Sequence, residues 1–184
     1  MQVVILSRNP ELYSTRRLSE VLYSRDHDVR VIDPYLCTVS LQNDGPQVMY
    51  EGNPITDIHA VIPRIGSHAD AAHAISVLRQ FEAIGACSVN SADNMAFADD
   101  KLISLEKLAA AGLAMPRTAF CWSWFDHTAL VELAGGPPVV IKMVKGTQGQ
   151  GVLLAKDMQS ADALIGSFQQ LNVPFLVQEF IAES

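Results

Sequence analysis

The chain has 184 residues, of which 49% are hydrophobic and 18% charged, and its formal net charge is −7. This acidic balance argues against a general nucleic-acid surface, because phosphate binding needs a basic face. The sequence holds no apolar run near the ~20 residues of a membrane span and no signal-peptide pattern at its N-terminus, so we expect a cytoplasmic protein without a membrane or nucleic-acid partner.

The first half of the chain alternates strand and helix patterns. In order, these are a buried strand at 3–7, a helix at 13–23 with Ser14 as a possible cap, a strand at 28–32, a polar stretch at 36–57 that fits a hairpin or an irregular excursion, a strand at 58–62, a helix at 69–84 stopped by Gly85, and a short strand at 87–89. This order predicts an α/β fold with a parallel sheet and right-handed crossovers.

The second half has a different rhythm. It predicts a helix at 91–111 that is broken near Asp99 and ended by Gly112, an extended segment at 118–121, a helix at 126–133, an apolar strand up to Lys142, a second apolar run at 152–155, a helix at 157–171 and a strand at 175–181. The change in rhythm places a domain boundary near 95–100, which gives domains at 1–97 and 98–184.

The stretch from Pro138 to Ala155 joins a lysine-bearing strand to a second apolar run through a glycine-rich loop. Gly146, Gly149 and Gly151 lack a Cβ, so their amides can approach an anion closely, with Lys142 as a positive charge beneath them. A Walker A loop and a dinucleotide fingerprint are excluded, because both open a helix. The kinase glycine flap is the closer analogue, and a merely glycine-rich hairpin stays open as the alternative.

Polar groups also follow strands of the first half. Arg8 and Arg64 each come directly after a strand, and ligands of α/β sheets sit at the carboxyl ends of strands. Both arginines could therefore clamp one carboxylate or phosphate, and Asn90 could join them or simply make a turn. The alternative is two surface arginines that pair with nearby acids.

Other polar residues carry two interpretations each. Lys101 follows two aspartates at a helix start, where a solvated lysine is the plain interpretation. Gln178 and Glu179 interrupt an apolar strand, so one of them faces a ligand or the strand lies at a sheet edge. The three cysteines are odd in number and widely spaced, which favours buried apolar filler over a disulfide or metal set; they are Cys37, Cys87 and Cys121.

Several of these segments together resemble the ATP-grasp ligases. They are Asp100-Lys101-Leu102, the strand VVIK ending in Lys142, the loop KGTQGQGV at 145–152 and the strand LVQEFI at 176–181. The segments ILSR at 5–8 and IPRIG at 62–66 are similar to the RimK family in particular, whose members add glutamate to the C-terminus of a ribosomal protein.

The resemblance implies a pre-ATP-grasp domain on the substrate side at 1–97 and the first α+β lobe of an ATP-grasp fold at 98–184, with the second lobe absent. It implies ATP and Mg²⁺ as cofactors, with Lys101 and Lys142 on the phosphates and Lys142 also reaching the adenine side. Arg8, Arg64 and Asn90 would help to hold the amino-acid or peptide substrate. The remaining cofactor-binding residues would be the flap Gly146, Thr147, Gln148, Gly149 and Gly151, together with Gln178 and the adenine hinge Glu179, Phe180 and Ile181.

The implied activity is a carboxylate–amine ligase that adds glutamate to the C-terminal tail of a small-subunit ribosomal protein through an acyl phosphate. The magnesium ligands and the acidic residue for the ribose are expected beyond Ser184, so no catalytic set is complete here and we expect the chain to be inactive alone. A homo-oligomer is one option for its assembly. Another ATP-grasp amino-acid or peptide ligase, or a non-catalytic nucleotide-binding module, stays open as an alternative.

Overall fold

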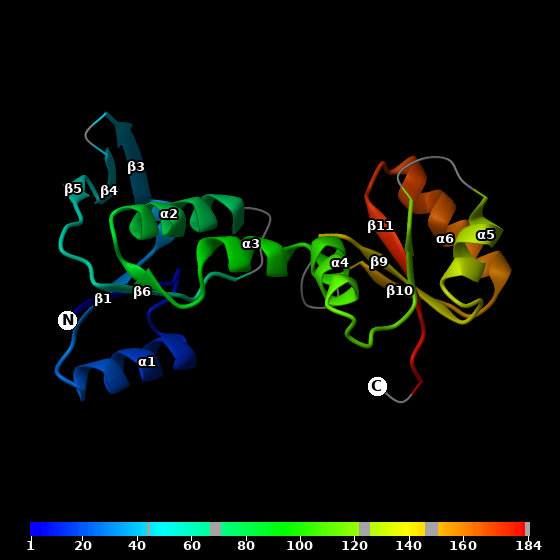
Figure 1. The fold of residues 1–184 in the computed structure, drawn as a ribbon, viewed down its shortest axis with the longest axis horizontal. Helices are drawn as coiled ribbons and strands as arrows, with labels where there is room; N and C mark the ends of the chain where they lie inside the picture. Colours follow the sequence, from blue (N-terminus) through cyan, green and yellow to red (C-terminus); the bar gives the residue numbers. More distant parts are fainter. Residues whose placement is uncertain (44, 67–70, 122–125, 146–150, 183–184) are drawn as a thin grey trace. The chain divides into compact units, whose positions relative to one another are not determined.

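The computed structural model describes residues 1–43, 45–66, 71–121, 126–145 and 151–182 (Figure 1). The chain forms two compact units, Met1–Phe97 and Ala98–Ser184, and each is described by itself. Within the described residues, no helix has both the length and the apolar character needed to cross a membrane.

Unit 1 is built on a four-stranded parallel sheet in the order β2-β1-β6-β7. This confirms the parallel sheet that the alternating sequence predicts. Its elements are β1 (Gln2–Leu6), α1 (Tyr13–Tyr23), β2 (Asp28–Ile32), the 3-10 turn η1 (Pro34–Leu36), β6 (Ala60–Pro63), α2 (Ala71–Ala83), β7 (Cys87–Ser88) and α3 (Ala92–Asp99).

Helices lie on both faces of this parallel sheet, with α1 on the opposite side from α2 (Figure 1). Strand β1 is therefore buried on both faces, and its Val4 and Leu6 pack in one core cluster with Phe81 of α2. Because α1 leads from β1 to β2 while α2 leads from β6 to β7, the chain winds in opposite directions from the boundary between β1 and β6. That boundary is the topological switch point of the sheet.

The polar stretch between β2 and β6 forms a small antiparallel sheet, so the hairpin interpretation is confirmed over the irregular one. Its strands are β3 (Cys37–Gln42), β4 (Gly45–Tyr50) and β5 (Asn53–Pro54), in the order β3-β4-β5. Val48 and Cys37 are buried in the core cluster that also contains α2 residues.

Two local expectations in unit 1 are wrong. Ser14 does not cap α1, because the helix begins one residue earlier with Leu12 as its N-cap and has no side-chain cap. The hydroxyl of Ser14 instead accepts a hydrogen bond from Arg64. Cys87 is exposed and is not apolar filler, whereas Cys37 is buried as expected.

Unit 2 is an antiparallel sheet in the order β10-β9-β11-β8. The run at 152–155 is a strand paired with β9, as the flap pattern predicts. The helix predicted at 91–111 breaks at Asp100, whose side chain caps the N-terminus of α4. The elements are α4 (Lys101–Ala110), β8 (Thr118–Phe120), α5 (His127–Leu133), β9 (Val139–Met143), β10 (Val152–Ala155), α6 (Met158–Gln170) and β11 (Phe175–Glu179).

Strand β11 lies inside this sheet, between β9 and β8. The edge-strand interpretation of Gln178 and Glu179 is therefore wrong, since an inner strand is paired on both sides. Helices α5 and α6 pack on one face, where Ile141, Val177 and Ile165 share a core cluster. The opposite face carries the polar side chains that the site is built from.

Candidate functional site

Strand alternation shows which residues lie on the face of the unit 2 sheet that points away from α5 and α6. Val139 and Ile141 of β9 enter the core, so Val140 and Lys142 point to the other face. Antiparallel register places Leu176 opposite Lys142 and Gln178 opposite Val140. We call this the open face; its β9 and β11 side chains are apolar apart from Lys142 and Gln178.

Lys142 lies on an inner strand of the sheet, half-buried on the open face. Its Nζ donates a hydrogen bond to Oε1 of Gln178 at 2.6 Å. Burial lowers the pKa of Lys142 below its ordinary value, and the nearby positive charge of Lys101 lowers it further. An ammonium group has three donors, and within the described residues only one of them is used. Two donors therefore remain for an anionic ligand.

Lys101 is the first residue of α4, and its backbone and side chain both turn toward the end of β9. Its backbone N–H donates to the carbonyl of Val144 at 3.3 Å, and its Nζ donates to the same oxygen at 3.4 Å. The plain interpretation of a solvated lysine is therefore incomplete, because this lysine is held against β9. The positive charge of Lys101 therefore acts on Lys142 near the point where β9 runs into the flap loop.

Gln178 is buried, with 6% of its surface exposed, and both ends of its amide are used. Its oxygen accepts from Lys142, and its Nε2 donates to Oγ1 of Thr118 on β8 at 2.8 Å. Sequence reasoning did not identify Thr118. Alternation along β8 gives no sign of its role, because the role depends on the pairing of Thr118 with Gln178 across strands.

Glu179 ends β11 and is tied to Arg117, a second residue that sequence reasoning missed. The guanidinium donates to both carboxylate oxygens at 3.3 and 3.1 Å, and the backbone N–H of Glu179 donates to the carbonyl of Arg117 at 2.8 Å. A Cβ on Gly135 would lie 2.6 Å from Nη2 of Arg117, so this glycine leaves room for the guanidinium. Phe180 and Ile181 follow the strand and are partly exposed.

The ion pair gives a pH-dependent prediction. Hydrogen bonds from Arg117 lower the pKa of Glu179 below 4.5, so the stability that the pair contributes is present above pH 4.5 and is lost as pH falls through the folded value. We expect Arg117→Ala to lower the free energy of unfolding at neutral pH and to have a smaller effect in acid. Urea unfolding followed by circular dichroism at both pH values measures this. Arg16→Ala, at a 3.9 Å surface pair, is the control, and a pH-independent effect of Arg117→Ala would contradict the prediction.

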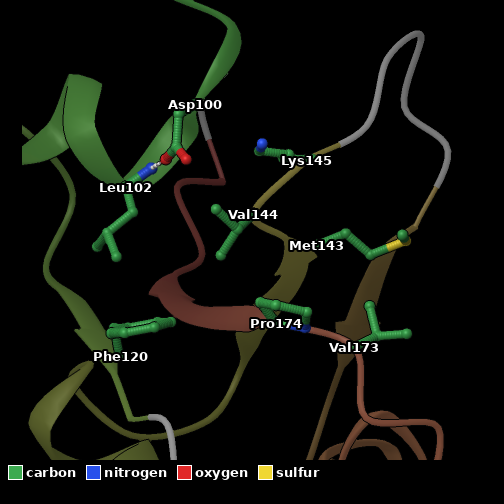
Figure 2. Close-up of a pocket in the computed structure, with 8 residues that line it drawn as sticks. All are labelled: Asp100, Leu102, Phe120, Met143, Val144, Lys145, Val173 and Pro174. Carbon is green, nitrogen blue, oxygen red and sulfur yellow. Dashed lines mark hydrogen bonds between the residues drawn. The ribbon is translucent and has the colours of Figure 1, made fainter. Parts of the chain in front are cut away.

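An apolar pocket of about 450 Å³ lies between the start of α4 and the residues that lead into β11 (Figure 2). Figure 2 shows Asp100, which accepts from the backbone N–H of Leu102 at 2.9 Å, and Lys145 as the charged members of an otherwise apolar lining. The expected residues Gln178 and Glu179 lie at the end of β11, Phe180 and Ile181 follow it, and none of the four lines this pocket. Its lining residues are Asp100, Leu102, Phe120, Met143, Val144, Lys145, Val173 and Pro174.

The flap itself is described only at its base. Gly146, Thr147, Gln148 and Gly149 lie outside the described residues. Gly151 is described, with a φ of +70° and its carbonyl oxygen accepting from the backbone N–H of Met143 at 3.0 Å. A Cβ at this position would lie 2.2 Å from Sδ of Met143, so the methionine packs directly over the glycine.

Unit 1 holds a separate pocket of about 450 Å³ at the carboxyl ends of its strands. Arg8, Arg64 and Asn90 all line this pocket, so the structure brings together the three residues that the sequence singled out. Arg8 follows β1 and Arg64 follows β6, and these strands flank the switch point. Because ligands of open α/β sheets bind at such points, the location favours a binding role.

Both arginines are held by neutral groups. The guanidinium of Arg8 lies 5.0 Å from the ring centre of Tyr35, and Nη2 of Arg64 donates to the hydroxyl of Ser14 at 3.1 Å. In the part of the chain that the structure describes, neither arginine forms an ion pair. Two positive charges without a carboxylate partner suit an anionic ligand. A metal ion has no comparable site, since the described residues contain no group of three or more histidine, cysteine, aspartate or glutamate side chains able to hold one.

Comparison with known proteins identifies the family to which the two units are similar. Residues 1–95 match the model of the RimK PreATP-grasp domain, and residues 98–184 match that of the RimK-like ATP-grasp domain. The chain is 45% identical over 184 residues to a protein of Alkalilimnicola ehrlichii named probable alpha-L-glutamate ligase, and 43% identical to one of the same name from Halorhodospira halophila. Both matches cover 100% of this chain and 61% of the relative, so the chain spans about three fifths of these relatives.

Solved structures agree on the fold. A RimK domain protein ATP-grasp from Sphaerobacter thermophilus gives a TM-score of 0.71 at 23% identity, over 98% of this chain and 64% of that one. The ATP-grasp ligase PsnB, complexed with minimal precursor, gives 0.68 at 23% identity over the same shares. At such identities the likeness concerns the fold alone.

Proposed function

Because the chain belongs to the RimK family of ATP-grasp proteins, we propose that it is part of an ATP-dependent carboxylate–amine ligase. The observation that carries the proposal is the placement of Lys142 on β9 and of Lys101 against the carbonyl of Val144, directly after β9, where the flap loop begins. Two ammonium groups at the base of a glycine-rich loop suit the phosphates of a nucleotide.

In the proposed site, Lys101, Lys142 and the flap residues 146–151 hold the phosphates. The apolar open face around Val140 supports the base of the nucleotide. Residues 178–181, at and just beyond the end of β11, serve as the hinge. Mg²⁺ accompanies ATP in this proposal, and the described residues contain no group of three or more histidine, cysteine, aspartate or glutamate side chains that could hold it. A carboxylate is a poor electrophile, so its oxygen first takes the γ-phosphoryl group of ATP, which releases ADP. The amine then attacks the carbonyl carbon of the acyl phosphate, and phosphate leaves as the amide forms.

The proposed substrates are glutamate and the C-terminal tail of a small-subunit ribosomal protein, joined in the cytoplasm. The glutamate part is supported by the name that the two relatives carry. The pocket of unit 1, with Arg8, Arg64 and Asn90, is proposed to hold an acidic group of the amino acid or peptide. Assembly into a homo-oligomer is kept as an option within this proposal.

The substrate role of the unit 1 pocket predicts the effect of removing one arginine. In the full-length enzyme we expect Arg64→Met to raise the KM for glutamate or for the acceptor peptide about 10- to 100-fold, because a lost charged hydrogen bond costs about 1.5–3 kcal/mol. The KM for ATP should stay unchanged. Arg25→Met, at an exposed arginine beyond the end of α1, is the control. Unchanged KM values for both substrates in Arg64→Met would remove the pocket from the proposal.

Release of ADP in the presence of glutamate and acceptor peptide tests the activity as a whole. We expect turnover by the full-length enzyme and none by the 184-residue chain alone. Turnover by this chain would overturn the second expectation. Acceptors assayed side by side separate ribosomal-protein modification from another amino-acid or peptide ligase. Nucleotide binding without ADP release by the full-length protein would instead favour a non-catalytic module.

A further inference from the structure

Three side chains on three neighbouring strands of unit 2 form a continuous chain of hydrogen bonds across the open face. Lys142 on β9 donates to Gln178 on β11 at 2.6 Å, and Gln178 donates to Thr118 on β8 at 2.8 Å. The hydroxyl of Thr118 donates in turn to the carbonyl of Pro116 at 2.9 Å. This series of hydrogen bonds therefore begins at the backbone oxygen of Pro116 and ends at the ammonium group of Lys142.

The direction of these hydrogen bonds is fixed by the number of hydrogens available. Thr118 has one hydroxyl hydrogen, which it gives to Pro116, so its oxygen can only accept from Gln178. The NH₂ group of the Gln178 amide must then face Thr118, which turns the amide oxygen toward Lys142. The reverse orientation would place amide hydrogens against an ammonium group and leave a buried amide oxygen facing a hydroxyl with no hydrogen to give.

The pairing of the strands makes this arrangement rigid. Gln178 is directly opposite Thr118 in the antiparallel register, whereas Lys142 lies diagonally across, opposite Leu176. Diagonal neighbours on one face lie within reach of a long side chain. Since Gln178 is buried on an inner strand, its amide cannot turn to water when a partner is removed.

We propose that Thr118 and Gln178 are positioning residues that hold the ammonium group of Lys142 in one orientation on the open face. The role of the lysine toward phosphate rests on the function proposed above, whereas the orientation itself is a property of unit 2. Thr118 acts only through Gln178, and Gln178 acts by accepting one donor of Lys142. The other two donors are thereby directed away from the sheet, where a ligand can accept them.

Nitrogen-15 NMR of the lysine side chains tests the positioning without using enzyme activity. The chain has five lysines, so Lys142 can be assigned by its loss in Lys142→Arg. We expect Thr118→Val to shift the Lys142 signal and lower its pKa, because the Gln178 amide is then held from one side only and its oxygen accepts less well from the ammonium group. Thr118→Ser should restore both. Gln178→Glu should raise the pKa by placing a carboxylate beside the lysine. Lys101 is the charged neighbour that acts on Lys142 in the folded chain, and it is unchanged in every variant.

Thr128→Val is the matched control, because Thr128 is exposed in the first turn of α5 and has no part in the chain of hydrogen bonds. If Thr118→Val is folded and leaves the titration of Lys142 unchanged, the inference is wrong. If Thr118→Val does not fold, Gln178→Glu decides alone, and an unchanged Lys142 pKa in that variant overturns the inference.

Kinetics of the full-length enzyme separate this inference from the proposed function. We expect Thr118→Val to raise the KM for ATP about 5- to 10-fold with kcat nearly unchanged, and Thr118→Ser to restore it, as for a lost hydrogen bond of about 1 kcal/mol. If Lys142→Ala weakens ATP binding but Thr118→Val does not, the positioning role of Thr118 is wrong and the proposed nucleotide site stands. If Lys142→Ala leaves ATP binding unchanged, the nucleotide site fails, whatever the NMR titration gives.

Discussion

Lys142→Ala in the full-length enzyme is expected to weaken ATP binding about 10- to 100-fold, as the loss of a hydrogen bond to a charged group costs about 1.5–3 kcal/mol. The same change should lower thermal stability less than it weakens ATP binding. It leaves the buried amide oxygen of Gln178 without its donor, but it also removes a charge that burial and the like charge of Lys101 both disfavour. Calorimetric titration with ATP and a thermal melt of the same sample measure the two effects.

Two further variants make this test specific. Lys142→Met keeps the aliphatic stem and removes only the charge, so it should bind ATP as weakly as Lys142→Ala. Lys156→Ala removes an exposed lysine just beyond β10 and should bind normally. Equal ATP affinity for Lys142→Ala and the unaltered enzyme would exclude this lysine from the nucleotide site.

The affinity for ATP should also depend on pH through Lys142. Burial and Lys101 lower its pKa below the ordinary 10.5, so the ammonium group loses its charge at a lower pH than an ordinary lysine does. The ATP affinity that depends on this charge should fall over the same alkaline range. In Lys142→Met, that part of the pH dependence should be absent.

Gly151→Ala is expected to destabilise unit 2 by about 2–4 kcal/mol, from two separate causes. At a φ of +70° an alanine is strained, since its Cβ approaches the following carbonyl. The added Cβ would also lie 2.2 Å from Sδ of Met143, so the methionine must leave its place over the base of the flap. Urea unfolding measures the total loss.

Two other glycines of unit 2 separate the causes. Gly112 has a similar φ of +66° with open space around its missing Cβ, so Gly112→Ala should show the backbone strain alone. Gly166 lies in α6, also with open space, and Gly166→Ala should be neutral or stabilising by up to about 1 kcal/mol. The double variant with Met143→Ala should lose the clash but not the strain. If Gly151→Ala is no less stable than Gly112→Ala, Met143 does not confine this position.

The resemblance to the RimK family that short motifs suggest is confirmed by the two domain models that match the chain. The parallel sheet of unit 1 and the β9–β10 pair were also predictable. Buried strands appear in the sequence as short apolar runs, and glycines mark where such runs end, so both signals can be read within a few residues. The helix break near Asp99 was predictable because a capping aspartate acts locally: Asp100 accepts from the backbone N–H groups of Leu102 and Ile103, two and three residues further on. The roles of the nucleotide and substrate residues remain predictions.

Alternation along β11 shows that one of Gln178 and Glu179 points to the open face, but it does not show which, or that the strand is internal. The antiparallel pairing with β8 and β9 decides both. Arg117 and Thr118 were missed for the same reason. Each meets its partner about 60 residues away in the chain, by side-chain contacts between paired strands.

The sequence by itself determined the family, the order of helices and strands, and the residue types available to hold phosphate and carboxylate groups. These properties depend on neighbours in the chain, where periodicity and glycine placement act. Only the tertiary structure decided that Arg8 and Arg64 flank the switch point of one sheet, and that Thr118 and Gln178 meet Lys142 on one face of another. Strand order and register bring these residues together, and both are set by how the whole sheet packs against its helices.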